Sequence, residues 1–397
     1  MSSDRITGSN PARVAFYNDP KVRSLVYQVV LCAAVAFLIY AAASNAIENL
    51  RRAHIASGFG FWYDPAGFDI SQTLIQYSSQ ASTYGRAFWV GLLNTLLVAG
   101  LGIVFATVLG FTIGIARLSK NWLLSKFATG YVEIIRNIPL LLQLLFWYNA
   151  VLKALPETRD SIAIPGGAFL NNRGLFLPSP VFLHDFDAVV VALIAGAIAA
   201  LAYYLWARKR QERTGRRAPV FWVTLVLLVG LPLAVFALRG FPLTFDYPQA
   251  GRFNINGGVE ALPEFAALLF GLSVYTAAFI AEVVRAGIMA VSRGQTEAAY
   301  SLGLKPGPTL RLIVVPQAMR VILPPLTSQY LNLTKNSTLA VAIGYPDLVQ
   351  IFTGTVLNQT GQAVEVVAIT MLVYLTISLV TSFLMNIYNR RVALVER

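Results

Sequence analysis

Long apolar stretches separated by short polar segments dominate this chain, and each stretch is long enough for a membrane-spanning helix. The hydrocarbon core of a bilayer is about 30 Å thick, and a helix needs about 20 apolar residues to cross it. Eight stretches meet this demand, although a polar patch that begins at Asn332 interrupts the seventh. The predicted spans are Ser24–Ala43, Ala87–Ala116, Phe127–Val151, Ala188–Ala207, Pro219–Leu238, Phe265–Ala290, Val321–Ile343 and Val364–Asn389.

The composition also indicates that lipid is the solvent. Of the 397 residues, 56% are hydrophobic and only 13% are charged, whereas soluble domains carry about 25% charged residues. The net charge of +12 would suit nucleic acid if it formed a continuous basic face with interleaved aromatic residues. The basic residues instead form short clusters between apolar stretches. We therefore expect an all-α integral membrane protein that does not bind nucleic acid.

The distribution of Lys and Arg predicts which loops face the cytoplasm. With eight spans, both termini share a side with residues 117–126, 208–217 and the loop after Ala290. These segments hold about 20 of the Lys and Arg residues, against about 8 in the opposite, acid-rich loops. Both termini are therefore expected in the cytoplasm. The strongest anchor is the run of Arg208, Lys209, Arg210, Arg213, Arg216 and Arg217.

The first span admits a second interpretation as a cleaved signal peptide. Basic residues precede an apolar run that ends in the small residues 41–46, which resemble a cleavage site. The apolar stretch of about 20 residues is longer than the usual 7–15 of a secretory signal, which favours an uncleaved span. The orientation of the later spans is the same under both interpretations.

The sequence lacks the residues that several other chemistries need. Cys32 is the only cysteine, and His54 and His184 are the only histidines, so neither a zinc cluster nor a Ser/His/Asp site is expected. No G-x-x-x-x-G-K-[ST] run is present that could bind the phosphates of ATP. We therefore expect no metal site, no cofactor and no enzymatic activity in this chain.

A polar segment, residues 292–316, separates the sixth and seventh spans. The sequence predicts a short helix over Gln295–Leu302, with Gly303 as its C-terminal stop. Two prolines then enforce a bend, and a second short helix is expected from about Thr309 until Pro316 breaks it. The result would be a small pair of helices outside the membrane, whose exposed alanines offer a flat surface to a partner.

This segment resembles the EAA motif of ABC-importer permeases. Val315 stands where the family usually has Leu, and the other motif positions match. The resemblance implies that the segment is the coupling helix, which docks into a cleft of an ATP-binding subunit. ATP and Mg would then be bound by that subunit and not by this chain. The matched positions are Glu297, Ala298, Ala299, Gly303, Ile313 and Pro316.

The resemblance extends along most of residues 85–390, except for about 155–262. It points to the polar amino-acid branch of these permeases, with spans two, three, six, seven and eight as the five-helix core of a type I ABC importer. The first span and the insertion resemble the long permease subunit of broad-range L-amino-acid uptake systems. The segments that carry the resemblance are Gly91–Leu96, Glu133–Leu141, Ala281–Ile288 and Leu333–Ser337.

These matches divide the chain into five parts. The parts are 1–84 (tail, first span and periplasmic loop), 85–154 (first part of the core), 155–262 (an insertion with two extra spans), 263–391 (the rest of the core, with coupling loop 292–316) and 392–397 (a cytoplasmic tail). We expect the insertion to be peripheral scaffold.

The resemblance implies a permease that imports polar or broad-range L-amino acids across the bacterial inner membrane. Its expected partners are ATP-binding subunits, a second related permease subunit that forms a heterodimer with it, and a periplasmic amino-acid-binding protein. The alternative is an ion-coupled secondary amino-acid transporter, which should show two matched halves with broken helices. In that alternative the segment around Glu297 would have no purpose.

Two pairs of opposite charges lie inside predicted spans. Glu133 and Arg136 are three residues apart in the third span, as are Glu282 and Arg285 in the sixth, and residues at this spacing share a helix face. A charge at the bilayer centre costs about 2.5–3.5 kcal/mol, so such residues normally pair or face water. Both pairs lie roughly 9–15 Å from the cytoplasmic helix ends. We expect them to meet at one level.

These charges could serve substrate passage or only lock helices together, and the sequence leaves both roles open. An amino acid is a zwitterion, which Arg and Glu could hold by its two charges. Gln143 lies seven residues beyond Arg136 and is expected on a similar face, and Pro139 between them could bend the helix and free a carbonyl. Lys335 and Asn336 in the seventh span raise the same question.

Overall fold

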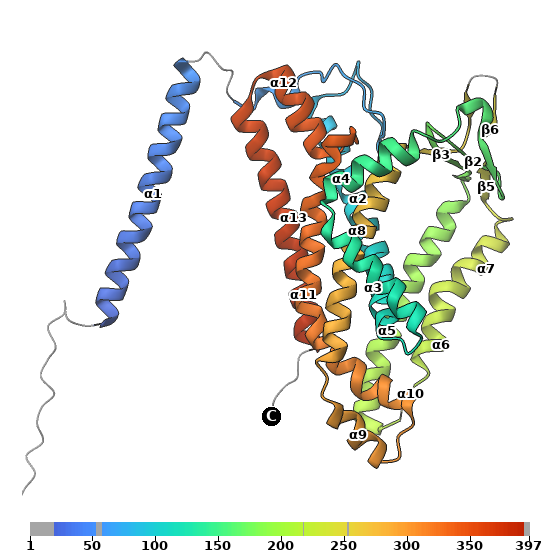
Figure 1. Ribbon diagram of the computed structural model, residues 1–397. Coiled ribbons are helices and arrows are strands. Elements are labelled where there is room, and N and C mark those ends of the chain that lie inside the picture. Colours follow the sequence, from blue (N-terminus) through green and yellow to red (C-terminus); the bar gives the residue numbers. More distant parts are fainter. Residues whose placement is uncertain (1–19, 53–57, 217, 252–253, 393–397) are drawn as a thin grey trace, which may run out of the picture.

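The computed structural model describes residues 20–52, 58–216, 218–251 and 254–392. The expected tails before Pro20 and after Val392, and Arg217 of the basic run, lie outside these residues. Within them, seven helices are long and apolar enough to cross a membrane, or eight if one bent pair counts as a single span. This confirms the predicted all-α membrane class and places a helix at each of the eight predicted spans (Figure 1).

The helices keep the order of the predicted spans, with short irregular helical segments between them. The helices are α1 (Pro20–Arg52), α2 (Tyr84–Arg117), α3 (Trp122–Asn137), α4 (Leu140–Leu145), α5 (Phe186–Thr214), α6 (Val220–Leu225), α7 (Leu231–Leu238), α8 (Pro263–Met289), α9 (Arg293–Ser301), α10 (Pro306–Thr309), α11 (Val315–Asn336), α12 (Leu357–Thr360) and α13 (Ala363–Val392). The 3₁₀ and π segments are Gly60–Tyr63, Phe146–Leu152, Thr158–Asp160, Val226–Gly230, Leu310–Val314, Ser337–Ile343 and Gln350–Val356.

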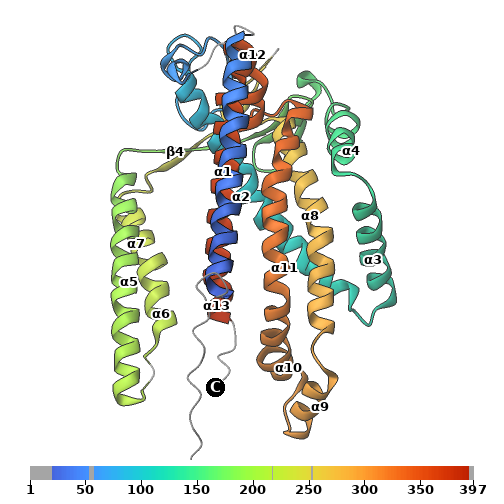
Figure 2. The same cartoon turned by 90° about the vertical axis from the view of Figure 1, so that its left-hand side faces the viewer.

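Eight short strands lie together at one end of the molecule, which we call the sheet end; α9 and α10 lie at the opposite end, the α9 end (Figures 1 and 2). The strands form an antiparallel sheet in the order β1-β2-β3-β8 and two hairpins, β4-β5 and β6-β7. The hydropathy pattern did not predict them, because they are two to four residues long. The strands are β1 (Ile162–Ile164), β2 (Ala168–Asn171), β3 (Gly174–Leu177), β4 (Ser179–Phe182), β5 (Leu243–Asp246), β6 (Gln249–Ala250), β7 (Ile255–Asn256) and β8 (Val259–Ala261).

The centre of the fold is the close packing of α2 against α8. Small residues recur at every fourth position of α2, and all of them are buried. A side chain cannot be added there, because a Cβ atom on Gly110 would lie 2.6 Å from Cβ of Ile280, and one on Gly114 would lie 2.8 Å from the carbonyl oxygen of Ala281. Lipid provides no hydrophobic force between helices, so such close backbone contact is a main source of association. The small residues are Gly102, Ala106, Gly110 and Gly114.

Three other elements complete a five-helix core around this pair. α3 and α11 pack against α8, and α13 packs against α11. Buried apolar side chains of α2, α8 and α11 fill the half of the core nearer the α9 end, including Ile280, Ile322 and Leu333. The five core elements are therefore those that the resemblance indicated.

The third predicted span is not one straight helix. α3 and α4 meet at an angle of 104°, and Pro139 occupies the N-cap of α4 after the extended residue Ile138. The bend frees backbone carbonyls, as expected from Pro139, and Nε2 of Gln143 donates to the carbonyls of Ile135 and Ile138, at 2.9 Å each. The buried side chain of Gln143 thus provides hydrogen-bond donors to the carbonyl groups that the break in the helix exposes.

The seventh span begins earlier than expected, and the prediction that Pro316 ends a short helix is wrong. A continuous helical stretch runs over Pro306–Ile343. The π-helical segment Leu310–Val314 lies directly before α11, whose second residue is Pro316. A proline clashes with the carbonyl four residues earlier in a regular helix, and the wider π turn accommodates it without a break.

The insertion forms a helical hairpin that stands apart from the core. α5 runs away from the sheet end, and α6, the π segment Val226–Gly230 and α7 return (Figure 2). Within α5 and the returning stretch, only 11% and 6% of the most apolar window is buried. α1 also stands apart in Figure 1, with none of its apolar window buried. These helices therefore leave most of their apolar surface for lipid or a partner.

A buried polar group joins the connection between the last two spans to the core. Asp347 lies in the segment between the spans that end at Ile343 and begin at Ala363. It is fully buried, and its carboxylate accepts hydrogen bonds from the N–H of Gln350 at 2.8 Å and the hydroxyl of Tyr374 at 3.2 Å. Burial raises the pKa of Asp347 to about 7.

Replacing Gly110 with Val should destabilise the folded chain by about 1–3 kcal/mol, because the added atoms overfill the contact with Ile280. Gly100→Val is the matched control. Gly100 lies on the same helix, is exposed, and has no atom within 4 Å of its added Cβ. Thermal unfolding of the purified protein in detergent measures the difference, and equal midpoints for both variants would contradict the packing.

The raised pKa of Asp347 predicts a stability that falls as the pH rises. Between the usual aspartate pKa of about 4 and about 7, the native carboxyl holds a proton that the unfolded chain has lost. The free energy of unfolding should therefore fall by up to about 1.4 kcal/mol per pH unit in this window. The Asp347→Asn variant, which keeps both hydrogen-bond positions occupied, should lose this dependence. Parallel pH profiles for the two proteins would exclude the assignment.

Candidate functional site

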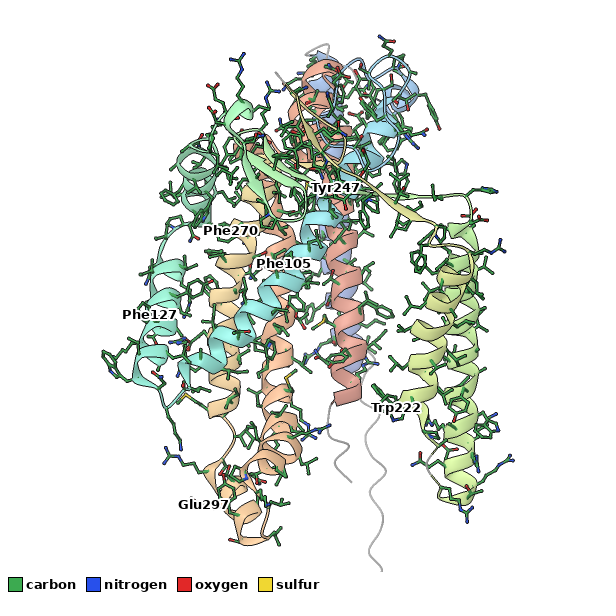
Figure 3. All side chains as sticks on the ribbon, turned by 90° about the vertical axis from the view of Figure 1, so that its right-hand side faces the viewer. Phe105, Phe127, Trp222, Tyr247, Phe270 and Glu297 are labelled. Carbon is green, nitrogen blue, oxygen red and sulfur yellow. The ribbon has the colours of Figure 1, made fainter. Side chains whose placement is uncertain are left out.

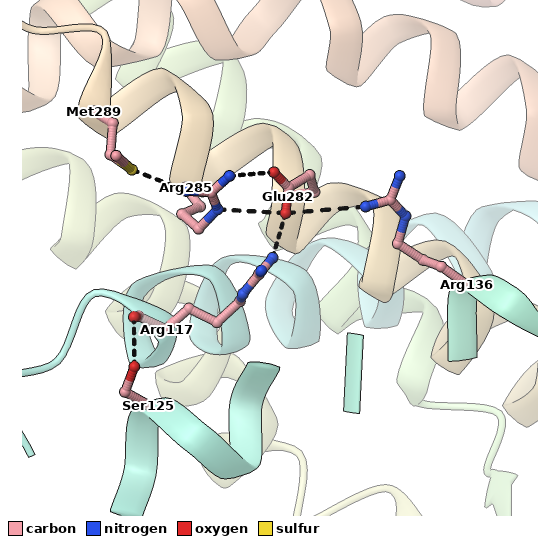
Figure 4. Close-up of polar contacts among 6 residues, drawn as sticks. All are labelled: Arg117, Ser125, Arg136, Glu282, Arg285 and Met289. Carbon is pink, nitrogen blue, oxygen red and sulfur yellow. Dashed lines mark hydrogen bonds and ion pairs between the residues drawn. The ribbon is translucent and has the colours of Figure 1, made fainter. Parts of the chain in front are cut away.

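The carboxylate of Glu282 on α8 lies among three guanidinium groups (Figure 4). Arg285, one turn further along α8, places Nη2 2.5 Å from Oε1 and Nε 3.3 Å from Oε2. Arg117 on α2 donates through Nη1 to Oε2, and Nη1 of Arg136 on α3 lies 4.0 Å from the same oxygen. We call these four residues the Glu282 cluster. One carboxylate thus joins three helices.

Helix ends and a tight connection place the arginines of this cluster. Arg117 is the last residue of α2, and Arg136 lies in the last turn of α3, where the partial negative charge of a helix C-terminus favours a cation. Asn121 caps α3 by accepting from two backbone N–H groups. The hydroxyl of Ser125 donates to the carbonyl of Arg117 at 2.9 Å, which holds the start of α3 against the end of α2 (Figure 4).

The Glu282 cluster carries an excess of positive charge, since three arginines surround one carboxylate. Arg117 is nearly buried, with 8% of its side chain exposed, whereas Arg136 is 37% exposed. A guanidinium in this position can attract and orient a carboxylate that lies beside the cluster.

The structure shows no candidate metal site. Within residues 20–52, 58–216, 218–251 and 254–392, no three His, Cys, Asp or Glu side chains lie together as metal ligands.

The expectation that both Glu–Arg pairs meet at one level is confirmed for Arg136, which lies beside Glu282, and is wrong for Glu133. Arg136 points toward α8, where its Cζ lies 5.0 Å from the centroid of the Phe279 ring. The side chain of Glu133 is exposed, and it forms no ion pair within the part of the chain that the structure describes. A spacing of three residues allows contact on a helix face, but Arg136 instead lies beside the Glu282 carboxylate and the Phe279 ring, both on α8.

The expectation that Gln143 shares a face with Arg136 is also wrong. The 104° bend between α3 and α4 removes the common helical face on which that expectation rested. The amide of Gln143 is 5% exposed, and its donor atoms are used by two backbone carbonyls. The side chain of Gln143 therefore lies inside the bend between α3 and α4.

A polar cavity lies one helical turn from the Glu282 cluster. Its volume is about 270 Å³, and residues of α8 and α11 line it. Phe279, on which Arg136 stacks, is one of them, so the cavity and the cluster share a wall. Lys335 is exposed and is not among the lining residues. The lining residues are Tyr275, Thr276, Phe279, Gln329, Asn332 and Asn336.

The segment that resembles the EAA motif forms a short helix at the far end of the molecule, as Glu297 in Figure 3 shows. α9 agrees with the predicted helix within two residues. Gly303 follows it with a φ of +76°, a left-handed conformation that favours glycine at a helix end. Ala299 is buried against the rest of the segment, whereas Glu297 and Ala298 are exposed.

Contacts tie α9 to the start of α11. Nε2 of Gln317 on α11 donates to Oε1 of Gln295 on α9 at 3.3 Å. The buried hydroxyl of Thr309 donates to the carbonyl of Lys305 at 3.0 Å and holds the bend between them. Ile313 and Pro316 lie half-buried on the α11 side of this bend. A force on α9 can therefore reach α11 without passing through a flexible linker.

Sequence reasoning missed Arg117 and Leu302. Arg117 was assigned to a loop, although it directly follows a long apolar stretch, where a charged side chain can reach a neighbouring membrane helix. Leu302 is 82% exposed at the end of α9, beside the half-exposed Tyr300. Two large apolar side chains in an otherwise polar segment were the signal in the sequence for this exposed apolar patch.

Comparison with known proteins finds similarity along nearly the whole chain. A family model described as the binding-protein-dependent transport system inner membrane component matches residues 213–394. The General L-amino acid transport system permease protein AapQ of Rhizobium johnstonii is 54% identical, over 97% of this chain and 96% of that protein. The Putative amino-acid ABC transporter permease protein YhdX of Escherichia coli is 53% identical, over 96% and 97%. The Glutamate/glutamine/aspartate/asparagine transport system permease protein BztB of Rhodobacter capsulatus is 44% identical, over 96% of each chain.

Replacing Glu282 with Gln should lower the free energy of unfolding by about 2 kcal/mol, because three arginines lose the charge that holds them together. Glu133→Gln is the matched control, and its effect should stay within about 0.5 kcal/mol, since that side chain is exposed. Thermal unfolding in detergent compares them. If Glu282→Gln unfolded at the same temperature as Glu133→Gln, the ion pairs of the Glu282 cluster would not stabilise the folded chain.

Proposed function

This chain belongs to the family of binding-protein-dependent transport system inner membrane components, and from that membership we propose that it passes L-amino acids through the membrane as the permease subunit of an ATP-driven importer. The amino-acid cargo is supported by the names of three relatives that are 44–54% identical over at least 96% of this chain. A range of polar or mixed L-amino acids fits the wording of those names. The chain itself is a transport subunit and not an enzyme.

The observation that carries this proposal is the α9 segment, with its motif residues Glu297 and Ala298 on the outside. We assign to it the docking of an ATP-binding subunit. The exposed side chains of Leu302 and Tyr300 offer apolar contact area next to the motif, which suits a partner's cleft. ATP and Mg would be held by that partner, since this sequence has no phosphate-binding loop.

The α9 end is assigned to the cytoplasm, with both termini on that side. The excess of Lys and Arg in the loops at this end supports the assignment. The sheet end then faces the periplasm, where a binding protein for amino acids would deliver the substrate. The inner membrane of a bacterium is the location that the family description, inner membrane component, supports.

The polar cavity and the Glu282 cluster are assigned to the substrate route. The cavity offers amide and hydroxyl groups from Thr276, Gln329 and Asn332, and Arg136 lies at its α9 side as a partner for a substrate carboxylate. The ion pairs below the cavity would act as a gate that opens when α8 moves relative to α2 and α3. Glu133 and Lys335, both exposed, would face the same route from the rim.

A second, related permease subunit would complete the pathway as a heterodimer. Arg136 and Glu282 keep 37% and 28% of their side chains exposed in the single chain, and charges inside a membrane normally face protein or water. A partner helix that covers this open side would remove the charges from lipid. An ion-coupled transporter would leave the α9 segment without a role.

Replacing Gly303 with Asp should uncouple ATP hydrolysis from uptake without preventing insertion. The left-handed φ of +76° costs a residue with a Cβ about 1–2 kcal/mol, and the new carboxylate opposes the dipole at the end of α9. ATP hydrolysis by the assembled complex in proteoliposomes should persist, while uptake of labelled amino acids should fall by about tenfold or more.

Gly307→Asp is the control for this experiment. It adds the same charge to the same loop at a position with open space around it and without a left-handed φ. Gly307 lies at the start of α10, where a carboxylate is favourable, so uptake should stay near the wild-type rate. Normal transport by Gly303→Asp would show that the coupling assignment is wrong.

A further inference from the structure

An apolar groove runs along the hairpin of the insertion, between α5 and α6. Its volume is about 580 Å³. Thr224 and Tyr204 are the only lining residues whose side chains carry polar atoms, and the others include Ala197, Leu201 and Phe221. A long apolar groove on a membrane-facing hairpin is suited to a hydrocarbon chain.

The groove follows from the way the two helices touch. The π-helical segment Val226–Gly230 brings the carbonyl of Leu227 against α5, where a Cβ added to Gly196 would lie only 2.1 Å from that oxygen. The helices are therefore in direct backbone contact at Gly196. Nearer the α9 end, Tyr204 and Phe221 line the two walls, and a channel remains between them.

Basic side chains follow the groove in the connection between α5 and α6. Residues 208–216 carry five basic side chains and one acidic side chain, Glu212, and all are exposed. Nε of Arg208 lies 3.2 Å from Oε1 of Glu212, and Cζ of Arg210 lies 5.2 Å from the Trp206 ring. Tyr204 precedes this run by one turn, and Val220, which lines the groove, follows it. The basic residues are Arg208, Lys209, Arg210, Arg213 and Arg216.

Tryptophans mark the level at which this run meets the membrane surface. Trp206 and Trp222 are half or more exposed on the two helices, and Figure 3 shows Trp222 near the lower end of the hairpin. Tryptophan is enriched where hydrocarbon gives way to lipid headgroups. The apolar groove and the basic run therefore lie on opposite sides of one interface.

We infer that this hairpin is a binding site for an anionic phospholipid, with an acyl chain in the groove and the phosphate against the basic run. A cluster of four to eight Lys and Arg residues directly beyond a membrane helix is typical of anionic-lipid recognition. A soluble polyanion would meet the basic run but leave the groove empty, whereas a zwitterionic lipid brings a cation to a site that already has an excess of positive charge. A partner helix would fill the groove without needing the arginines.

The charge requirement is tested by native mass spectrometry of the assembled transporter. The complex is equilibrated at low salt with equal amounts of phosphatidylglycerol and phosphatidylcholine that carry the same acyl chains. The wild type should retain phosphatidylglycerol preferentially. Replacing all five basic residues of the run with Gln should reduce the ratio of retained phosphatidylglycerol to phosphatidylcholine by about tenfold. The variant with Lys at the four arginine positions keeps the charge and should keep the ratio.

The role of the groove is tested separately by enlarging one side chain that lines it. Ala197→Trp obstructs the groove, and Ala199→Trp adds the same ring to an exposed position on the opposite face of α5. We expect Ala197→Trp to reduce the amount of retained phosphatidylglycerol by about fivefold or more, while the complex keeps all of its subunits. Ala199→Trp should leave the retained phosphatidylglycerol unchanged. An unchanged lipid ratio in the Gln variant would overturn the inference. Loss of a partner subunit from Ala197→Trp, with lipid retention unchanged, would also overturn it, because the groove would then hold a protein helix.

Discussion

The close approach of α2 to α8 is the contact on which the other arrangements in this chain depend. Two helices in lipid gain nothing from hiding apolar surface from each other, so they associate through backbone proximity and polar contacts. Gly110 and Gly114 permit that proximity because any side chain would overlap α8. The same contact brings the end of α2 beside the C-terminal third of α8, where Arg117 reaches Glu282. The Glu282 cluster is thus a consequence of helix packing as much as of charge.

The chain connects this cluster to the α9 segment by short, structured links. Only residues 290–292 separate α8, which carries Glu282, from α9. Beyond α9, a continuous helical stretch over Pro306–Ile343 carries the cavity residues Asn332 and Asn336. A displacement of α9 would therefore act on α8 and α11, which form the two walls of the cavity. It would also act on the Glu282 cluster, which lies at the α9 side of the cavity. In the proposed importer, this is how nucleotide energy spent in another subunit would change access to the substrate route.

Hydropathy predicted the spans because each crossing must be long and apolar whatever it packs against, whereas the choice of the five core helices came from the family resemblance. Side-chain direction and proline geometry depended on tertiary context. Pro139 follows an extended residue and bends its span by 104°, whereas Pro316 is absorbed by a preceding π turn. Arg136 turned from the nearby Glu133 to a carboxylate on another helix, which no spacing within one span could reveal. The strands of the insertion were too short to carry a period.

The central claim is that α9 contacts a nucleotide-hydrolysing subunit. Ala298 is exposed on α9, and Cys32 is the only native cysteine, so Ala298→Cys in a Cys32→Ser background provides a single attachment point for a short thiol-reactive photo-cross-linker. In the complete transporter in native membranes, we predict a cross-linked product that contains an ATP-binding subunit and whose yield changes when ATP is added. A chain that assembles and transports normally, but whose Ala298→Cys cross-links never include an ATP-hydrolysing protein, would contradict the account.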